Sequence, residues 1–423
     1  MKKFFLFIAS IIILFVILIY WSLNSTPKDA ENSIIIDVEN VDSLNFKDYD
    51  SLTIAASTLY KGNELKQMMQ GEHYRKAWAT PIKVPVVFLD TLRGGLDLIK
   101  EGGGHQTKSL KFKDSIGNKY ALRSINKDPS PLIPEFAKTL GLENIIIDGI
   151  SAQHPYAAIV VAALADAAKV LHTVPVIYFV PKQNALGEYN DDYGNKLYLF
   201  EHETEAVSNW TTINNVDEII ETDDLQELKL EKGDSLKIDE HALVRARLFD
   251  LFIGDWDRHA KQWGWVIQNE GNHKIAIALP ADRDNAFFNI SGIIPHLVSN
   301  KNVTPEMRPF EKDIDYMPGL VQDFDIYFLK DVPEEVFITE AKQLQKSLTD
   351  DAIKKALQLW PSQIYELDGK EIEEKLKSRR DELISYAKTF KKILDEKDYI
   401  EEPLKGSEDI DFNGHYLKCF ECY

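Results

Sequence analysis

Hydrophobic and polar residues divide the 423-residue chain into an apolar start and a mixed body. Residues 4–21 carry no charge, and eighteen helical residues at ~1.5 Å each span roughly 27 Å, close to the hydrocarbon thickness of a bilayer. Lys2 and Lys3 precede this run, which favours an inner N-terminus and an outer body. We therefore predict a transmembrane anchor. A cleaved signal peptide is the alternative, but the run is long and ends in Tyr20 and Trp21, which are typical of a membrane interface.

The body begins with a polar, acidic segment and then alternates between strand and helix patterns. Residues 22–54 resemble a stalk between membrane and domain. Period-2 alternation predicts strands at residues 109–113 and 119–125, joined by a Ser-Ile-Gly-Asn turn. Residues 131–172 favour helix, and the strand pattern returns after them. The first half is therefore predicted to be rich in strands, with one helical block.

The second half contains one short hairpin among helices. Asp239 is placed to cap a helix at residues 240–253, whose apolar positions follow helical spacing. A polar loop follows, and then a predicted strand pair at residues 263–267 and 274–279. Helical patterns extend over residues 333–395. Together these patterns predict an α+β protein.

Net charge and cysteine content argue against some binding partners and indicate a cellular compartment. The formal net charge is −19, and an acidic surface repels phosphate backbones, so we expect no nucleic-acid partner. The two cysteines, Cys419 and Cys422, have no second ligand pair for zinc, so we expect two thiols in a flexible acidic tail. Scarce cysteine also favours a bacterial envelope over a eukaryotic secretory lumen.

A glycine-rich segment of the first half lies between an apolar run at residues 96–99 and the predicted strand at residues 109–113. It runs from Glu101 to Ser109 and reads EGGGHQTKS. Three consecutive glycines let backbone N–H groups approach a phosphate closely. The segment is one residue away from a Walker A motif, but a strand pattern follows it where a P-loop needs a helix. We interpret it as a flap over a nucleotide, with a structural hairpin turn as the alternative.

Two acidic loops flank the hairpin of the second half. Asp257 lies before its first strand, and Asp282 and Asp284 follow its second strand. An antiparallel hairpin brings its outer ends together, so we expect these carboxylates to meet. Clustered carboxylates repel one another at neutral pH, and a divalent cation such as Mg²⁺ is the simplest compensation. The alternative is an Arg–Asp surface network through Arg258 and Arg283.

Binuclear metallophosphatases offer a rival interpretation. Their GDxxDR and GNH motifs resemble Gly254-Asp-Trp-Asp-Arg258 and Gly271-Asn-His273, with Asp239 and His241 upstream. The first motif is one residue short here, and the second falls in a hairpin turn without its acidic partner. A metallophosphoesterase is therefore the second alternative.

At the two acidic loops the chain resembles the atypical branch of the protein-kinase-like superfamily, which includes HipA-type serine kinases, CotH spore-coat kinases and Golgi secretory-pathway kinases. The segment IGDWDRHAKQWGWVI is similar to their G-N-x-D-R-H-x-x-N segment and the strand after it. This match implies that Asp257 is the catalytic base and that Gln262 stands where these kinases carry a metal-binding Asn. ALPADRDNAFF resembles their metal-binding loop. This match implies that Asp282 chelates the metal, with Asp284 as the alternative ligand.

The same resemblance implies phosphate contacts in the first half. EGGGHQTKSLKF resembles the glycine loop between the first two strands of these kinases, so Gly102, Gly103 and Gly104 would cover the phosphates. Lys108, in the same loop, would supply a further positive charge.

Tyr120-Ala-Leu-Arg123 aligns with the Val-Ala-Ile-Lys segment on the third kinase strand. Alternation puts Ala121 and Arg123 on one face, and Arg in place of Lys still holds phosphate through two N–H groups. The resemblance implies Glu135 as the helix carboxylate that pairs with this residue. Glu201, at the end of a strand, corresponds to the hinge that contacts adenine.

The resemblance implies a bilobal protein-kinase-like fold behind a single N-terminal transmembrane helix. The expected division, in chain order, is an inner N-terminus at residues 1–3, the anchor at 4–21, a stalk at 22–54, a strand-rich N-lobe at 55–202, a helix-rich C-lobe at 203–397 and an acidic tail at 398–423.

The implied activity is transfer of the γ-phosphoryl group of ATP to an unknown hydroxyl acceptor, with Mg²⁺ or Mn²⁺ as cofactor. Arg123 and Gln262 depart from the family pattern, so an inactive pseudokinase or ligand-binding scaffold of the cell envelope is the first alternative. The expected location is the bacterial inner membrane, with the N-terminus inside and the body in the periplasm. A Golgi-type lumenal body is the alternative.

Overall fold

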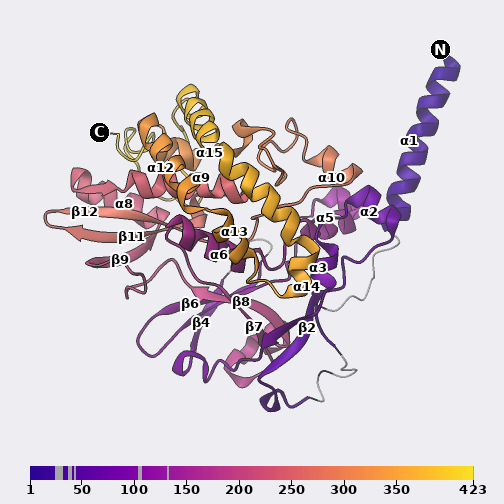
Figure 1. Ribbon diagram of the computed structural model, residues 1–423, viewed down its shortest axis with the longest axis horizontal. Helices are drawn as coiled ribbons and strands as arrows, with labels where there is room; N and C mark the ends of the chain where they lie inside the picture. Colours follow the sequence, from indigo (N-terminus) through magenta and orange to yellow (C-terminus); the bar gives the residue numbers. More distant parts are fainter. Residues whose placement is uncertain (24–31, 37–40, 42–43, 103–106, 131–132, 423) are drawn as a thin grey trace.

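Helices and strands combine into a mixed α+β architecture (Figure 1). The computed structural model describes residues 1–423 except 24–31, 37–40, 42–43, 103–106, 131–132 and 423. In this described part of the chain the strands form three sheets. The α+β class predicted from the sequence is confirmed.

Helix α1 (Lys2–Leu23) projects away from the rest of the molecule (Figure 1). It is long and apolar enough to cross a membrane, and its apolar window has no part buried in the body. A second segment, Glu143–Ala168, passes the same test of length and composition but is mostly buried. Helix α1 is therefore compatible with a single-pass anchor, and equally with a signal sequence.

A three-stranded antiparallel sheet forms the start of the body. Its order is β1 (Asn32–Ile35), β2 (Ser51–Ser57) and β3 (Ile82–Pro85). Ile35, Leu52 and Ile54 belong to the main hydrophobic core. The stalk expected at residues 22–54 is therefore corrected, because the apolar side chains of its two strands are buried in the body.

A five-stranded antiparallel sheet follows in the chain. Its order is β4 (Asp97–Gly102), β5 (Ser109–Lys113), β6 (Lys119–Ser124), β8 (Lys196–His202) and β7 (Val176–Val180). Both strands predicted from alternation at its centre are confirmed. Tyr120 and Leu122 of β6 pack into a hydrophobic cluster separate from the main core, so Ala121 and Arg123 point to the opposite face.

A four-stranded sheet contains the predicted hairpin. Its order is β10 (Leu236–Ile238), β12 (His273–Pro280), β11 (Trp263–Glu270) and β9 (Val216–Glu221), with β10 parallel to β12 and the other pairs antiparallel. Trp263 lies opposite Pro280, and Glu270 lies opposite His273. The loop before β11 and the loop after β12 therefore leave the sheet at the same end, as predicted.

Helix α9 (Glu240–Ile253) leads into the first acidic loop. It starts where predicted, because the Asp239 side chain accepts a hydrogen bond of 2.9 Å from the backbone N–H of Ala242. It ends at Gly254, whose φ of 70° is a left-handed conformation that glycine adopts without strain. A Cβ at this position would also lie 2.6 Å from the ring of Phe310, so no larger residue fits the turn.

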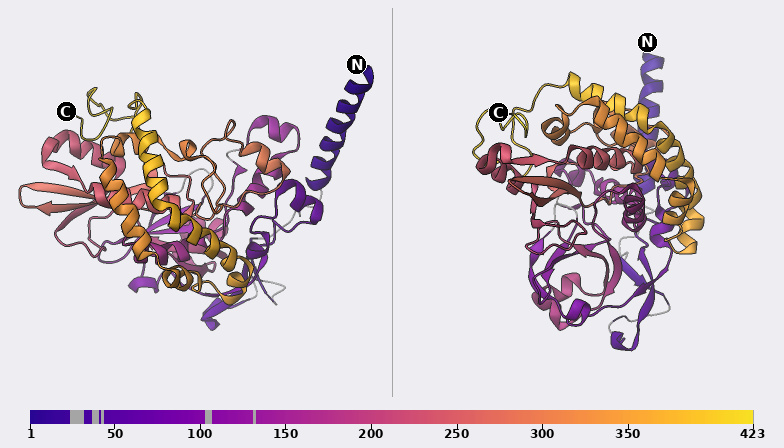
Figure 2. Two further views of the ribbon diagram at one scale, coloured as in Figure 1. Left: turned by 45° about the horizontal axis from the view of Figure 1, so that its top comes forward. Right: turned by 60° about the vertical axis from the view of Figure 1, so that its left-hand side comes forward.

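The longer helices pack together around α9. Helices α12 (Glu334–Ser347) and α15 (Lys370–Glu396) lie side by side along one flank of the body and both contact α9, as does α6 (Ala157–Ala168) (Figure 2). The remaining helices are α2 (Glu64–Gln70), α3 (Arg75–Ala79), α4 (Glu135–Thr139), α5 (Glu143–Gly149), α7 (Asn190–Tyr193), α8 (Thr222–Lys232), α10 (Ile293–Val298), α11 (Asp323–Leu329), α13 (Asp350–Leu357) and α14 (Ser362–Ile364).

The C-terminal segment lies against the body and not free in solvent. Leu404 and Phe420 are buried in the main core, and the backbone N–H of Phe420 donates a 3.1 Å hydrogen bond to the carbonyl of Tyr327. Cys419 and Cys422 are joined by a disulfide. The flexible tail with two thiols expected at residues 398–423 is therefore corrected, because apolar residues within the acidic segment fix it to the core.

Candidate active site

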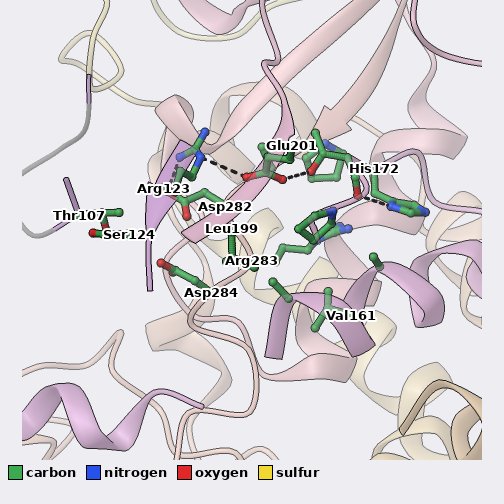
Figure 3. Close-up of a pocket in the computed structure, with 16 residues that line it drawn as sticks. Thr107, Arg123, Ser124, Val161, His172, Leu199, Glu201, Asp282, Arg283 and Asp284 are labelled. Carbon is green, nitrogen blue, oxygen red and sulfur yellow. Dashed lines mark hydrogen bonds and ion pairs between the residues drawn. The ribbon is translucent and has the colours of Figure 1, made fainter. Parts of the chain in front are cut away.

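A cleft lies where the five-stranded sheet, helix α6 and the loop after β12 meet (Figure 3). The sheet lines it with Arg123, Leu199 and Glu201. Helix α6 contributes the small apolar side chains Ala158, Val161 and Ala162, and the loop contributes residues Pro280 to Asp284. The cleft thus combines an apolar wall with charged groups at one end, as small-molecule sites commonly do.

Arg123 connects the sheet to the loop after β12. Its Nε lies 3.1 Å from Glu201 Oε1, and one terminal nitrogen lies 3.3 Å from Asp282 Oδ2. The strand register puts Ala121 opposite Glu201, so Glu201 and Arg123 lie on the same face of the sheet. Thr173 donates a hydrogen bond to the other oxygen of Glu201. Burial raises the pKa of Glu201, and the charge of Arg123 partly opposes this shift.

The expected pairing of Arg123 with Glu135 does not occur. Glu135 is almost fully exposed in α4 and pairs with Lys138 at 2.9 Å. The helix that lines the cleft is α6, whose cleft-facing residues are alanines and a valine. Glu201, expected at the hinge, supplies instead the carboxylate beside Arg123.

Lys127 forms an ion pair with one carboxylate, and the charges of two others influence its pKa. Its ammonium group pairs directly with Asp284. Burial lowers the pKa of Lys127, but Asp284, Asp282 and Asp257 together raise it above its ordinary value. Arg258 of the first acidic loop donates a 2.8 Å hydrogen bond to the carbonyl of Ala281 in the second, so the two loops lie side by side, as the hairpin argument predicts.

The two carboxylates after β12 have opposite electrostatic environments. Burial alone raises the pKa of Asp282, but Arg123 and Lys127 outweigh it and hold the pKa below the ordinary range. Burial and the nearby charge of Asp282 raise the pKa of Asp284 to about 6. In this corner of the cleft Asp282 thus pairs with Arg123 and Asp284 pairs with Lys127, so a divalent cation that binds here would compete with these two ion pairs.

Asp257 is half-buried and stands slightly apart from this pair. Its Oδ1 lies 3.8 Å from Nε2 of His259. Among the described residues, the oxygens of Asp257, Asp282 and Asp284 do not all lie within 4.8 Å of one another. The three side chains share one electrostatic site without forming a single compact ligand set.

Gln262 is held next to the second loop by backbone contacts. Its carbonyl accepts a 3.0 Å hydrogen bond from the backbone N–H of Ala281, the residue before Asp282. The side chain is nearly buried, and its Nε2 lies 3.5 Å from Nε2 of His259. The backbone of Gln262 therefore lies beside the second acidic loop, and its side-chain amide lies beside His259.

A buried arginine–aspartate network fixes the two loops relative to helix α9. Asp250 is fully buried, with Nε of Arg258 at 3.1 Å, Nε of Arg283 at 2.9 Å and a terminal nitrogen of Arg247 at 3.3 Å. Arg258 also donates hydrogen bonds to the carbonyls of Ala281 and Gln262. The network expected at the surface through Arg258 and Arg283 is thus corrected: it is internal and centred on Asp250, which the sequence did not single out.

The pKa values of Asp250 and Asp255, two aspartates of this region, shift in opposite directions. Burial raises the pKa of Asp250, but Arg258 and Arg283 outweigh it and lower the pKa. Burial raises the pKa of Asp255 well above its ordinary range. The carboxylate of Asp255 accepts a 3.2 Å hydrogen bond from the backbone N–H of Asp257, so it shapes the loop that carries Asp257.

Arg283 presents unsatisfied donors beside the cleft. Its Nε is bound by Asp250 and its guanidinium lies 4.7 Å from the ring centre of Phe249. Its two terminal nitrogens are buried and have no hydrogen-bond partner among the described residues. A buried guanidinium in this state suits a ligand that carries hydrogen-bond acceptors.

The expected glycine loop is only partly described. Gly102 ends β4, where a Cβ would lie 3.0 Å from Ser109 Oγ, and Thr107 lines the cleft. Gly103 and Gly104 lie outside the described residues. Lys108 is exposed and does not line the cleft, although its charge acts on Asp128.

The metallophosphatase motifs are not brought together. Asp239 and His241 lie at the start of α9, where His241 pairs with Glu340 at 2.7 Å, whereas Gly254 ends the helix. His273 lies in the turn of the hairpin, at the end opposite to Pro280. A shared metal site for these residues is excluded by this separation.

Three groups of the site were not identified from the sequence: Lys127, Asp250 and Arg283 as a donor to the cleft. Lys127 follows the predicted strand, where alternation no longer says which way a side chain points. Asp250 did leave a signal, since it interrupts the apolar helix segment LFDLFI, and a charge in such a position is usually buried with a partner.

Comparisons with known proteins leave the family of the chain open. No protein-family model matches the sequence, and a search of curated proteins finds no match. Among solved structures, the chain is similar to the crystal structure of a Helicobacter pylori proinflammatory kinase, CtkA. The identity is 13%, the alignment covers 71% of this chain and 97% of that chain, and the TM-score is 0.35. A likeness at this level leaves both fold family and activity undecided.

Proposed function

We propose that this chain is a membrane-tethered, kinase-like enzyme that transfers the γ-phosphoryl group of ATP to a hydroxyl acceptor outside the cytoplasm. The observation that carries the proposal is the meeting of both acidic loops at a cleft lined by Arg123. Asp282 and Asp284 line this cleft, and the loop that carries Asp257 contacts their loop through the hydrogen bond from Arg258 to the carbonyl of Ala281.

The arrangement of the two halves supports a bilobal fold of the kinase type. The five-stranded sheet has its own hydrophobic cluster, and the helices around α9 belong to the main core. The cleft lies between the sheet on one side and the loop after β12 on the other. Two cores with a charged cleft between them suit an enzyme whose lobes each hold one part of a nucleotide.

The donor set fits Mg²⁺ or Mn²⁺ together with the phosphates of ATP. Asp282 and Asp284 offer two carboxylates, and Gln262 offers an amide oxygen. Mg²⁺ is commonly bound by one or two carboxylates plus substrate phosphates, which is the number available here. When bound, the ion would neutralise charge on the phosphates during transfer.

Arg123 and Arg283 line the cleft, and Lys127 is connected to it through the ion pair with Asp284, so the charged side chains divide into two roles. Arg123 and Lys127 would hold phosphate oxygens, and the unsatisfied nitrogens of Arg283 would donate to the nucleotide. Asp257 would orient the acceptor hydroxyl and take its proton as the oxygen bonds to the γ-phosphorus. The bond from this phosphorus to the bridging oxygen breaks, and ADP leaves.

In this proposal α1 is an uncleaved anchor of the bacterial inner membrane, with the N-terminus inside and the body in the periplasm. Its length and apolar surface support a single span, and the two lysines at its start support this orientation.

One observation favours a second candidate, a ligand-binding pseudokinase. The ion pairs Arg123–Asp282 and Lys127–Asp284 satisfy the metal-binding carboxylates from within the chain. A protein that keeps these pairs would bind a ligand in the cleft without metal and without turnover.

Thermal unfolding of the purified full chain, titrated with ATP and Mg²⁺, tests the proposal. Saturable stabilisation that needs both components, about 2.7 kcal/mol at a hundred times the dissociation constant, is expected. Mg²⁺-dependent release or transfer of labelled γ-phosphate is expected under the same conditions. Stabilisation by ATP in the presence of EDTA, without phosphate transfer, supports the pseudokinase instead. No stabilisation at millimolar nucleotide contradicts both.

A further inference from the structure

The end of helix α1 is docked onto the body. Ser22 and Leu23, at its end, are buried. The side-chain amide of Gln70, at the end of α2, donates a 2.8 Å hydrogen bond to Ser22 Oγ. The hydroxyl of Tyr20 donates a 2.8 Å hydrogen bond to the carbonyl of Leu140, just after α4. The direction of α1 is therefore set by contacts with the body.

The elements at this joint are themselves fixed by a buried ion cluster. Asp148 of α5 lies 2.8 Å from Nζ of Lys66 in α2 and pairs with Arg75 of α3. All three side chains are almost fully buried. Breaking such a cluster leaves uncompensated buried charges, so α2, α3 and α5 move as one unit.

An apolar patch surrounds the joint. We define the anchor-side patch by six large side chains that are between 42% and 67% exposed: Met68, Phe136, Leu140, Ile293, Leu297 and Val298. Met68 lies on α2, Phe136 and Leu140 belong to the α4 region that accepts the Tyr20 hydrogen bond, and the others lie on α10.

Helix α10 reaches the joint through a close backbone contact. The backbone N–H of Glu72 donates a 3.1 Å hydrogen bond to Ser291 Oγ, and a Cβ on Gly292 would lie 2.3 Å from the backbone nitrogen of Gly71. Figures 1 and 2 show α2 and α10 near the base of α1.

We propose that the anchor-side patch is a second membrane contact, inserted into the interfacial region of the bilayer that α1 spans. This rests on the proposal that α1 is an uncleaved anchor, and not on phosphoryl transfer. Tyr20 and Trp21 lie at the interface if residues 4–21 span the bilayer, and the Tyr20–Leu140 hydrogen bond puts Leu140, one residue of the patch, at the same depth. The occupant is lipid because the patch lies on elements next to the end of the apolar helix: Leu140 accepts a hydrogen bond from Tyr20 of α1, and α2 contacts both α1 and α10.

The proposal changes the geometry of the protein at the membrane. A body with a flexible stalk would rotate freely above the bilayer, whereas this body would be held in one orientation by the joint and the patch. Half-exposed apolar side chains gain roughly 25 cal/mol for each Å² removed from water, so six of them add to the anchoring of α1.

Variants of the full chain that each carry one added cysteine test this contact. The native cysteines form a disulfide, so Phe136→Cys and Leu297→Cys can be labelled separately with an environment-sensitive fluorophore. Ile116→Cys is the matched control, because Ile116 is an apolar residue, 78% exposed, in the turn between β5 and β6. Val16→Cys, within α1, reports whether the anchor is inserted.

The labelled proteins are reconstituted in phosphatidylcholine vesicles with or without brominated acyl chains. Bromine quenching at positions 136, 297 and 16, with none at 116, is the expected result. Quenching at 16 alone overturns the patch contact and leaves the anchor. Shielding of 136 and 297 from water without bromine quenching also overturns it, since a protein partner then covers the patch. An unquenched label at 16 refutes both the anchor and the contact, whatever the protein's phosphotransferase activity.

Discussion

Arg258 Nε lies 3.1 Å from Asp250 Oδ2, and both side chains are fully buried. This ion pair connects the loop that carries Asp257 to the end of helix α9. Arg283 binds the other oxygen of Asp250 at 2.9 Å, so the loop that carries Asp282 and Asp284 is held by the same carboxylate. One buried aspartate therefore sets the relative position of both acidic loops.

Asp250→Asn is expected to destabilise the protein strongly. The change leaves the three arginines around this position without their shared counter-charge in a buried site, and such losses are worth about 3–5 kcal/mol. Urea unfolding measures the effect. The control is Asp191→Asn, whose side chain is 92% exposed, and which should change the free energy of unfolding by less than about 1 kcal/mol. Equal stability of the two variants would show that Asp250 does not organise the loops.

Asp257→Asn is expected to keep the fold and nucleotide binding but to lower the rate of phosphoryl transfer by about 10²–10⁴-fold. The side chain is half-buried, and its one ion pair among the described residues is the 3.8 Å contact with His259, so stability should change little. The rate is measured by transfer of labelled γ-phosphate, and binding by ATP-dependent thermal stabilisation. A turnover rate equal to that of wild type would remove Asp257 from the mechanism.

Arg123 and Lys108 are expected to differ in their effect on ATP affinity. Arg123 lines the cleft between two carboxylates, so Arg123→Met should weaken ATP binding at least tenfold, about 1.4 kcal/mol, while Arg123→Lys retains part of it. Lys108 is exposed and does not line the cleft, so Lys108→Met should change the affinity less than about threefold. Calorimetric titration with ATP and Mg²⁺ gives both values. A larger loss of ATP affinity in the Lys108 variant than in the Arg123 variant would indicate that Lys108, in the glycine loop, contacts the phosphates.

His73 is expected to make the fold sensitive to acid. Burial, followed by the charge of Arg75, lowers the pKa of His73 to about 4 from an ordinary value of 6.5. The unfolded chain therefore binds a proton on this residue between pH 6.5 and 4 while the folded protein does not, so acidification favours unfolding. The loss approaches about 3 kcal/mol at pH 4.

His73→Gln removes this titration, so its free energy of unfolding should fall less steeply than that of wild type between pH 6.5 and 4. Urea unfolding at several pH values measures the slopes. His415→Gln, at an exposed position, is the control and should follow wild type. Parallel slopes for all three proteins would mean that His73 is protonated in the folded state as readily as in the unfolded chain.

Much of the local structure followed from the sequence, because short-range patterns govern it. Alternation located β5 and β6, and helical spacing with a capping aspartate located α9. The hairpin of β11 and β12 then brought the loop of Asp257 next to the loop of Asp282 without further information, since antiparallel pairing joins the outer ends of its strands.

The partners of the charged groups could not be predicted in this way. Glu135 and Glu201 are both glutamates within reach of Arg123 by sequence reasoning, and only the packing of the cleft leaves Glu135 in solvent. Asp250 was identifiable as a buried charge, but the sequence did not indicate that Arg258 and Arg283 both bind it.

By itself, the sequence determined an apolar N-terminal helix, the α+β class and a candidate pair of acidic loops, because each depends on neighbours a few residues apart. The tertiary structure alone decided that residues 32–35 and 51–57 belong to the body, that the C-terminal segment is packed, and that Lys127 pairs with Asp284. The physical reason is that a side chain is buried or paired by segments that are distant from it in the chain. The free energy of removing its charge or apolar surface from water therefore depends on the whole fold.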